Sequence, residues 1–391
     1  MSEYASALLI VDDNEDNRYT LMRRLQRQGY SNLTVAEDGQ QALDLLGARA
    51  FDLVLLDIMM PVMNGYQVLE HMRGDQRLRH IPVIMISALD EMDSVIRCIE
   101  LGAEDYLAKP FNPTLLRARV GATLDKKHLR DELIQHARRM EKELEAARAM
   151  QLSMVPTDFP APTAERPFAV HATLQPAHEV GGDLYDCFLL QPGRLCLLVA
   201  DVSDKGAAAA LFMARAKTTL RLIAMRLASD AAQKPSPAAL VSAANEELCR
   251  DNPMAMFVTM FLLLADTATG ELEWCNAGHT LPYRIGADGT VSGLPHGRSI
   301  PVGVRPAMTL ATGTLQLAPG ESLFAYTDGI TEATNATAEF FGERRLETTL
   351  ALGAGQGPRA LVGTVLDAVR DFAAGAPPAD DIAALACRWQ A

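Results

Sequence analysis

The stretch Leu195–Leu220, LCLLVADVSDKGAAAALFMARAKTTL, constrains the fold of this chain more than any other segment. Its apolar opening is typical of a short buried strand, and a helix of Ala, Leu, Phe and Met follows a turn. Asp201 stands where this strand ends. A carboxylate in that place costs free energy unless a metal ion or a helix N-terminus stabilises it. If Asp201 stood alone, a capped strand-to-helix turn would explain it.

Three further stretches also place a carboxylate at the edge of a strand. GGDLYD contains Asp183, FAYTDG contains Asp328, and ADD contains Asp380 and Asp381. If these side chains converge with Asp201, they form an oxygen-rich site of the kind that Mg²⁺ or Mn²⁺ prefers. Taken singly, each motif is better explained as a turn, because Asp-Gly is a strong turn signal. Spacing alone leaves both explanations open.

A series of motifs in this part of the chain resembles a known family. They occur in the order DVSDKGAAAALFMA, MFVTMFLLLAD, NAGH, IPVGV, YTDGITEATN, FFGERRL and DDIAAL. Together they resemble the SpoIIE/RsbU-like branch of the metal-dependent protein phosphatase 2C superfamily, from about Pro156 to the C-terminus. The resemblance implies an αββα sandwich and a protein serine/threonine phosphatase.

The same resemblance implies a site with two Mn²⁺ or Mg²⁺ ions. Asp201 would bridge the ions and the backbone carbonyl of Val202 would add a ligand, while Asp183 would hold one ion and Asp328 and Asp380 the other. Asp380 aligns better than Asp381, but the two adjacent residues stay alternatives. A water shared by two metals is close to hydroxide at neutral pH and can attack a phosphoserine or phosphothreonine in line.

The proton donor to the leaving oxygen is a point where the chain departs from the eukaryotic relatives. Where they carry a histidine, this chain has Ser203, and no arginine stands in an obvious phosphate-binding position. His279 and Lys205 are the candidates. For His279, a purely structural role in a strand turn explains the residue equally well.

Composition limits the classes of protein that remain. The chain has 391 residues, which indicates two or three domains, and a formal charge of −13, which argues against nucleic acid and anionic membranes as partners. Its six cysteines form no CxxC pair, which favours the reducing cytoplasm. The N-terminus lacks the pattern of a signal peptide, and the longest apolar runs are too short to span a bilayer.

The first hundred residues alternate short apolar runs with helical patterns. This alternation predicts a five-stranded, doubly wound parallel sheet. The residues at the carboxyl ends of its predicted strands are polar, and in such sheets the binding site lies at that edge. They are Asp12, Asp13, Asp57, Ser87 and Lys109.

This constellation resembles the receiver domain of two-component response regulators. The resemblance implies that Asp57 is the phosphate acceptor, that Asp12, Asp13, Asp57 and the carbonyl of Met59 bind Mg²⁺, and that Lys109 pairs with the phosphoryl group. Ser87 and Tyr106 would be the switch pair, and the bond before Pro110 would be cis. Mg²⁺ and a lysine would neutralise charge on a transferring phosphoryl group. A flavodoxin-like domain without phosphotransfer is the alternative.

A long charged helix is predicted from Pro113 to about Val155. Its apolar and small residues alternate steps of four and three, which predicts a two-stranded coiled coil and hence a homodimer. The alternative is a single helix packed on its own domain. The predicted seam consists of Leu133, Ala137, Met140, Leu144, Ala147, Gln151 and Met154.

Beyond this helix, the proline-rich stretch Pro156–Pro167 predicts a linker. Apolar and alternating runs then predict the strands and paired helices of the sandwich. The predicted strands are Phe168–Leu174, Leu184–Leu190, Arg194–Val202, Met256–Leu264, Leu272–Asn276, Pro282–Ile285, Met308–Leu317, Ser322–Tyr326 and a final one from Ile382.

The sequence therefore predicts a receiver domain (1–121), a coiled-coil linker helix (122–155) and a phosphatase domain (156–391). A sensor histidine kinase would phosphorylate Asp57 and so control the phosphatase. By the family resemblance, the substrate would be a phosphorylated anti-sigma-factor antagonist. The alternative is an adaptor with a catalytically silent phosphatase-like domain that sequesters or delivers a sigma-factor regulator. A DNA-binding output is excluded because no basic helix-turn-helix follows the receiver.

Overall fold

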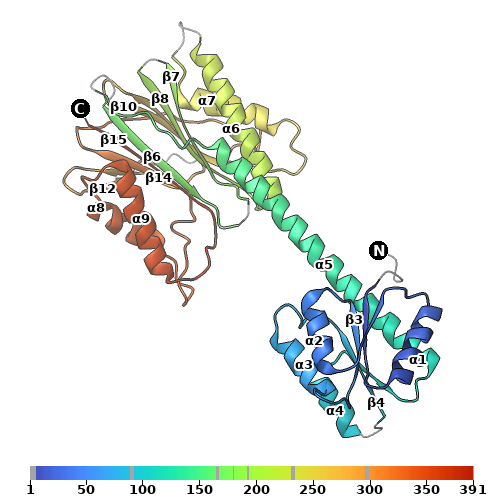
Figure 1. Cartoon of the computed structure of the whole chain (residues 1–391). Coiled ribbons are helices and arrows are strands. Elements are labelled where there is room, and N and C mark those ends of the chain that lie inside the picture. Colours follow the sequence, from blue (N-terminus) through green and yellow to red (C-terminus); the bar gives the residue numbers. More distant parts are fainter. Residues whose placement is uncertain are drawn as a thin grey trace. The chain divides into compact units, whose positions relative to one another are not determined.

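The structure is a computed structural model that describes residues 6–88, 92–163, 167–178, 180–191, 193–229, 234–295 and 299–390. The chain divides into two compact units, Met1–Met140 and Glu141–Ala391, and the division falls within helix α5 (Pro113–Met154) (Figure 1). Each unit contains its own sheets and hydrophobic cores.

The first unit is built on one sheet of five parallel strands in the order β2-β1-β3-β4-β5. This confirms the predicted doubly wound parallel sheet. Besides α5, its elements are β1 (Leu8–Val11), α1 (Glu15–Arg27), β2 (Leu33–Ala36), α2 (Gly39–Ala48), β3 (Leu53–Asp57), α3 (Gly65–Gly74), β4 (Val83–Ser87), α4 (Met92–Glu100) and β5 (Asp105–Ala108).

Helices cover both faces of this sheet. The central strands β1, β3 and β4 are therefore buried along their whole length. One face packs against α2, α3 and α4, and the other against α1 and the first turns of α5. Local signals set the starts of the helices: the side chains of Asn14, Asp38 and Asn64 accept hydrogen bonds from the first turns of α1, α2 and α3. This arrangement leaves the carboxyl ends of the strands free to form a site.

Helix α5 confirms the predicted long helix but corrects one residue of its predicted seam. Leu133 and Met140 are 70% and 63% exposed, as residues that await a partner helix would be. Gln151 is only 4% exposed, and its amide pairs with the backbone of Gly181 in the same chain. Gln151 is therefore not a seam residue, because the last turn of α5 packs on the second unit instead.

The second unit consists of two antiparallel sheets, each of five strands, with two helices against each. The sheet orders are β13-β10-β9-β8-β7 and β12-β11-β14-β15-β6. The elements are β6 (Phe168–Gln175), β7 (Leu184–Gln191), β8 (Arg194–Val202), α6 (Ala207–Ala228), α7 (Pro237–Cys249), β9 (Val258–Asp266), β10 (Glu271–Ala277), β11 (Tyr283–Ile285), β12 (Val291–Gly293), β13 (Gly313–Gln316), β14 (Ser322–Tyr326), α8 (Gly342–Leu352), α9 (Pro358–Ala373) and β15 (Ile382–Trp389).

Three apolar layers hold this unit together. One lies between α6, α7 and the first sheet, one between the two sheets, and one between the second sheet and α8, α9. Figure 1 shows the two helix pairs on opposite outer faces, which confirms the predicted αββα sandwich. The predicted strand Met308–Leu317 was too long, because only Gly313–Gln316 pairs with β10, and the short strand β12 was not predicted.

The segment after Pro156 is packed rather than free. Phe159 contacts His171 edge-on, with ring centroids 5.5 Å apart, and lies against Tyr185. The described part of the predicted linker before residue 164 therefore lies on the second unit as part of it. Among the described residues, no helix combines the length and the apolar character needed to cross a membrane.

Candidate functional site

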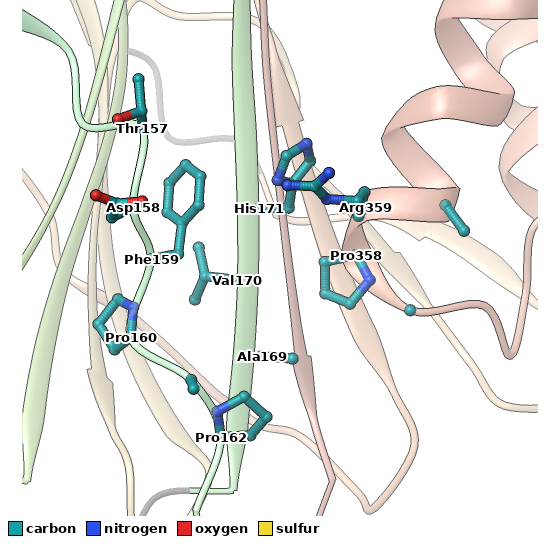
Figure 2. Close-up of a pocket in the computed structure, with 13 residues that line it drawn as sticks. Thr157, Asp158, Phe159, Pro160, Pro162, Ala169, Val170, His171, Pro358 and Arg359 are labelled. Carbon is teal, nitrogen blue, oxygen red and sulfur yellow. The ribbon is translucent and has the colours of Figure 1, made fainter.

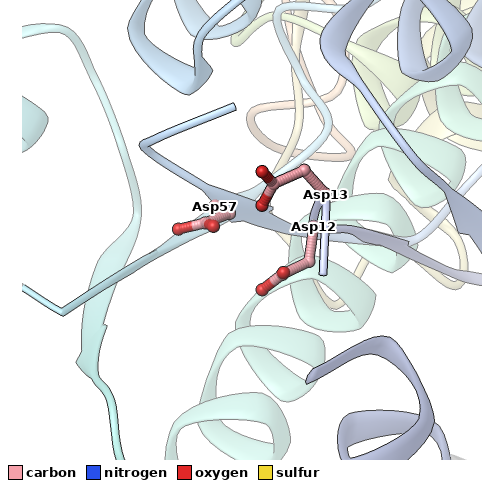
Figure 3. A group of neighbouring side chains, drawn as sticks. All are labelled: Asp12, Asp13 and Asp57. Carbon is pink, nitrogen blue, oxygen red and sulfur yellow. The ribbon is translucent and has the colours of Figure 1, made fainter. Parts of the chain in front are cut away.

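The first candidate site lies at the carboxyl edge of the parallel sheet. Asp12 and Asp13 follow β1, and Asp57 ends β3. One oxygen from each can be chosen so that all three lie within 4.8 Å of one another, and Figure 3 shows the three carboxylates side by side. Elsewhere in the described ranges, no other group of three metal-ligating side chains meets so closely.

Lys109 completes this cluster from the end of β5. Its Nζ lies 2.8 Å from Oδ2 of Asp12 and 2.8 Å from Oδ2 of Asp57. Burial raises the pKa of Asp57, and the Lys109 ammonium offsets only part of this effect. Burial alone would lower the pKa of Lys109, but its hydrogen bonds to the two aspartates raise it overall. Asp12 and Asp57 are buried and Asp13 is exposed, and the three carboxylates offer only oxygen ligands, which suits a divalent cation.

The remaining residues predicted for this site lie around the same edge. Ser87 is buried at the end of β4, and Tyr106 is half-buried in β5. Met59 follows β3 and its side chain is 66% exposed, so only its backbone is suited to a role in the site. The Lys109–Pro110 peptide bond is cis, as expected.

The second candidate site begins at the paired ends of β7 and β8. Leu184 pairs with Ala200, so the antiparallel register places Asp183 opposite Asp201 at the edge of the first sheet. Besides burial, the neighbouring charge of Asp201 raises the pKa of Asp183, which is consistent with this register. The sheet register therefore brings together two acids that are far apart in the sequence.

Asp328 and Asp380 come from the matching edge of the second sheet. Tyr326 pairs with Ala384, so the residues after β14 and before β15 lie side by side. Thr327 Oγ1 donates to Asp183 Oδ2 at 2.6 Å and so links the two sheets at the site. Sequence reasoning missed Thr327, although its place next to Asp328 in the TDG motif was a usable signal.

The pKa shifts of three of these carboxyl groups show that they influence one another, and that Asp380 contributes to this effect. Burial, followed by the charge of Asp328, raises the pKa of Asp201 to about 7. Burial and the charge of Asp201 raise the pKa of Asp183 well above its usual value. Burial, Glu332 and Asp380 raise the pKa of Asp328. Such a cluster has too little positive charge of its own, and hard divalent cations would supply it.

The adjacent residues Asp380 and Asp381 have different surroundings. Asp381 is buried, and its two oxygens accept hydrogen bonds from the backbone N–H groups of Ala177 and Gly182 at 2.8 and 2.9 Å. Asp380 is partly exposed, and its Oδ2 lies 2.9 Å from Nζ of Lys205. Asp381 therefore holds the loop before Asp183, whereas Asp380 faces the open side of the cluster.

The two candidate proton donors also differ. His279 is 4% exposed, its Nδ1 lies 2.8 Å from Thr259 Oγ1, and burial lowers its pKa to about 3. A buried imidazole that stays neutral favours the structural role. Lys205 is half exposed beside Asp380, and this pairing raises its pKa. Lys205 is thus the cation that adjoins the acid cluster.

The two glycines before Asp183, Gly181 and Gly182, have no room for a side chain. A Cβ on Gly181 would lie 1.6 Å from Asp381 Oδ2, and a Cβ on Gly182 would lie 2.8 Å from the carbonyl oxygen of Val202. The backbone must approach both groups this closely for the loop to deliver Asp183. Only glycine permits that approach.

A large pocket of the second unit lies elsewhere. It has a volume of about 770 Å³ and is bordered by the segment around Phe159, by β6 and by the start of α9 (Figure 2). Figure 2 shows Phe159 on one side of it and His171 and Arg359 on the other. None of the clustered carboxylates lines it. Of these carboxylates, Asp380 lines a smaller pocket of about 180 Å³.

Comparisons with known proteins agree with this division of the chain. Residues 8–121 match the response regulator receiver domain family. Over 122 residues, the chain is 45% identical to the transcriptional regulatory protein CpxR of Escherichia coli K12, a match that covers 31% of this chain and 50% of CpxR. The first unit is thus a receiver domain.

Residues 191–390 match the family described as Stage II sporulation protein E (SpoIIE). Protein IcfG of Synechocystis sp. is 32% identical over 228 residues, which are 53% of this chain and 35% of IcfG. The chain thus matches between a third and a half of the length of these curated relatives. The SiaA-PP2C domain of Pseudomonas aeruginosa shares the fold, with a TM-score of 0.56, 21% identity, and coverage of 65% of this chain and 99% of that one. The chain belongs to the Stage II sporulation protein E (SpoIIE) family, with a receiver domain joined to the matching region.

Proposed function

We propose that this protein is a response regulator whose output is a metal-dependent protein serine/threonine phosphatase. The observation that supports the proposal is the pairing of strand ends that sets Asp183 opposite Asp201 and Asp328 near Asp380, with Thr327 linking the two sheets. The oxygens of these aspartates offer ligands for hard cations and for nothing softer. An adaptor with a silent domain would have no need to keep four mutually repelling carboxylates together.

In this proposal, each residue has a distinct task. Asp201 and the carbonyl of Val202 would contribute to holding two Mn²⁺ or Mg²⁺ ions, Asp183 would hold one of them, and Asp328 and Asp380 would hold the other. When bound, such ions would activate a water molecule and neutralise charge on the phosphoryl oxygens. Lys205 stands beside Asp380 and can attract the phosphoryl group and protonate the leaving serine oxygen.

The receiver part of the proposal rests on the cluster of Asp12, Asp13, Asp57 and Lys109. Asp12, Asp13, Asp57 and the carbonyl of Met59 would hold Mg²⁺. Asp57 would accept the phosphoryl group from a sensor histidine kinase, and Lys109 would exchange its carboxylate contact for a contact with that group. Ser87 and Tyr106 would transmit the change.

The wider setting is also proposed. The substrate class is a phosphorylated anti-sigma-factor antagonist, on the strength of the family alone. The exposed stretch of α5 from Leu133 to Ala147 would pair two chains in a cytoplasmic homodimer. The three-part division into 1–121, 122–155 and 156–391 stays a prediction, with the coiled-coil helix as its middle part.

Phosphatase assays on the purified full chain test the catalytic half. We expect hydrolysis of an aryl phosphate and of a phosphoserine protein with Mn²⁺, loss of activity with EDTA, and loss in Asp201→Asn. Asp204→Asn is the matched control, because it makes the same charge change at an exposed turn residue nearby. Wild-type turnover in Asp201→Asn would refute the two-metal mechanism. An inactive wild type that still binds a phosphoprotein would favour the adaptor.

Phosphoryl control through the receiver needs its own assay. Beryllofluoride with Mg²⁺ imitates an aspartyl phosphate, so its addition should change the phosphatase rate of the wild type. Asp57→Ala should not respond, because it lacks the acceptor carboxylate. An equal response in both proteins would contradict control through Asp57.

A further inference from the structure

The last turn of α5 is tied to the loop that carries Asp183. Gln151 Nε2 donates to the carbonyl oxygen of Gly181 at 2.5 Å, and Gln151 Oε1 accepts from the Gly181 N–H at 3.1 Å. A side-chain amide thus satisfies both polar groups of one residue of the loop. Gln151 is 4% exposed, so water cannot readily replace these bonds.

The chain just beyond α5 makes a second contact on the other side of Asp183. Tyr185 donates its hydroxyl to the carbonyl oxygen of Pro156 at 2.8 Å, and Val155 packs in the core between the two sheets with Tyr185. Gly181 precedes Asp183 by two residues and Tyr185 follows it by two. The end of α5 therefore holds the backbone on both sides of this carboxylate.

The loop between these contacts has little freedom to move independently. Asp381 Oδ2 accepts from the Gly182 N–H at 2.9 Å, and the backbone of Gly181 and Gly182 lies against Asp381 and the carbonyl of Val202. A displacement of Gly181 would therefore be passed to residues that adjoin Asp183 and Asp201. The close contacts around Gly181 and Gly182 leave no free space for the loop to move without moving its neighbours.

From these contacts we infer that Gln151 is a positioning residue for the metal site of the phosphatase domain. It fixes the Gly181–Gly182 loop and thereby sets where Asp183 stands relative to Asp201. The inference rests on the proposed function, since it takes Asp183 as a metal ligand. The inference also goes beyond the proposed function, because it assigns the mechanical link between the linker helix and the metal site to one side chain.

The size of the effect follows from what the amide does. Residues that orient metal ligands typically change metal affinity by about 10–100-fold when they are replaced. Gln151→Met keeps most of the volume and the apolar packing but can neither donate to nor accept from Gly181. We expect it to raise the half-saturating Mn²⁺ concentration at least about tenfold, with much of kcat recovered at saturating Mn²⁺.

The test uses the full chain, with Mn²⁺ as the probe. Mn²⁺ binding is measured by calorimetry and, separately, from the metal dependence of aryl phosphate hydrolysis; circular dichroism and melting temperature report folding. Met150→Ala is the matched control, since Met150 is 66% exposed on the same turn. It should leave the half-saturating Mn²⁺ concentration unchanged. Tyr185→Phe, which removes only the hydroxyl contact with Pro156, should weaken Mn²⁺ binding in the same direction.

The outcomes separate this inference from the proposed function. If wild type binds no Mn²⁺ and hydrolyses nothing, the proposed function fails. If wild type is active and Gln151→Met has a lower melting temperature but the wild-type Mn²⁺ response, Gln151 is structural and the inference is wrong. If Gln151→Met does not fold, Tyr185→Phe decides the matter, and an unchanged Mn²⁺ response in that variant overturns the inference.

Discussion

Asp380 and Asp381 are adjacent, yet their replacement should have opposite consequences. Asp381 accepts two backbone hydrogen bonds in a buried place, and each bond to a charged group contributes about 1.5–3 kcal/mol. Its charge also repels Asp183 and Asp201, which offsets part of that gain. We therefore take the lower bound and expect Asp381→Ala to reduce the free energy of unfolding by about 3 kcal/mol.

Asp380→Ala should leave stability almost unchanged and abolish metal-dependent phosphatase activity. Its salt bridge with Lys205 joins two groups that are 34% and 52% exposed, and such pairs contribute about 0–1 kcal/mol. Loss of its charge also relieves repulsion with Asp328 and Asp201. The expected change in the free energy of unfolding is thus below about 1 kcal/mol.

Tryptophan fluorescence during urea denaturation is the assay for both variants. The two tryptophans of the chain, Trp274 and Trp389, lie in the core between the two sheets of the second unit. Their signal therefore follows the phosphatase domain without a contribution from the receiver. Equal loss of stability in Asp380→Ala and Asp381→Ala, or wild-type stability in Asp381→Ala, would refute the division of tasks between the two residues.

Three further predictions concern other parts of the chain. Lys217 forms a buried ion pair with Asp186 at 3.0 Å. Lys217→Met should therefore lower the free energy of unfolding by about 3 kcal/mol in the same fluorescence assay, and the double variant with Asp186→Leu should recover most of that loss. A loss below about 1 kcal/mol in Lys217→Met would contradict this. The pKa of His279 falls from 6.5 to about 3 on folding, so the native state binds fewer protons and stability is lost as the pH falls below 6.5. Between pH 7.5 and pH 5 this loss should be about 2 kcal/mol in wild type and absent in His279→Gln, and an equal pH dependence in both proteins would speak against it. Leu144→Glu should convert a dimer to a monomer in light scattering and uncouple the phosphatase rate from beryllofluoride, whereas a monomeric wild type would leave the coiled coil without support.

The sequence predicted those features that follow from strand order and pattern. Asp12, Asp57 and Lys109 meet because the carboxyl ends of parallel strands share one edge, and their approach needed no knowledge of side-chain packing. The convergence of Asp183 with Asp328 depended on two sheets stacking in one register, which only the family resemblance supplied. The alternative of isolated turns could not be dismissed from spacing.

The features that the sequence did not predict depend on which surface covers a residue. Gln151 fitted the heptad pattern but packs on its own domain. Periodicity identifies a face of a helix, but not whether that face meets a second chain or the same chain. Asp381 looked equivalent to Asp380 until the backbone amides around it were known. The first half of the predicted strand Met308–Leu317 failed because apolar residues there do not pair with β10.

The two glycines before Asp183 limit how this protein can change over evolutionary time. Position 181 cannot gain a side chain while an aspartate occupies position 381, since a Cβ would lie 1.6 Å from its Oδ2. Any lineage that replaced Gly181 would have to shorten residue 381 at the same time, and would then lose the acceptor for the Gly182 N–H. We therefore expect positions 181 and 381 to be substituted together or not at all. A suppressor screen that starts from Gly181→Ala should return substitutions at position 381.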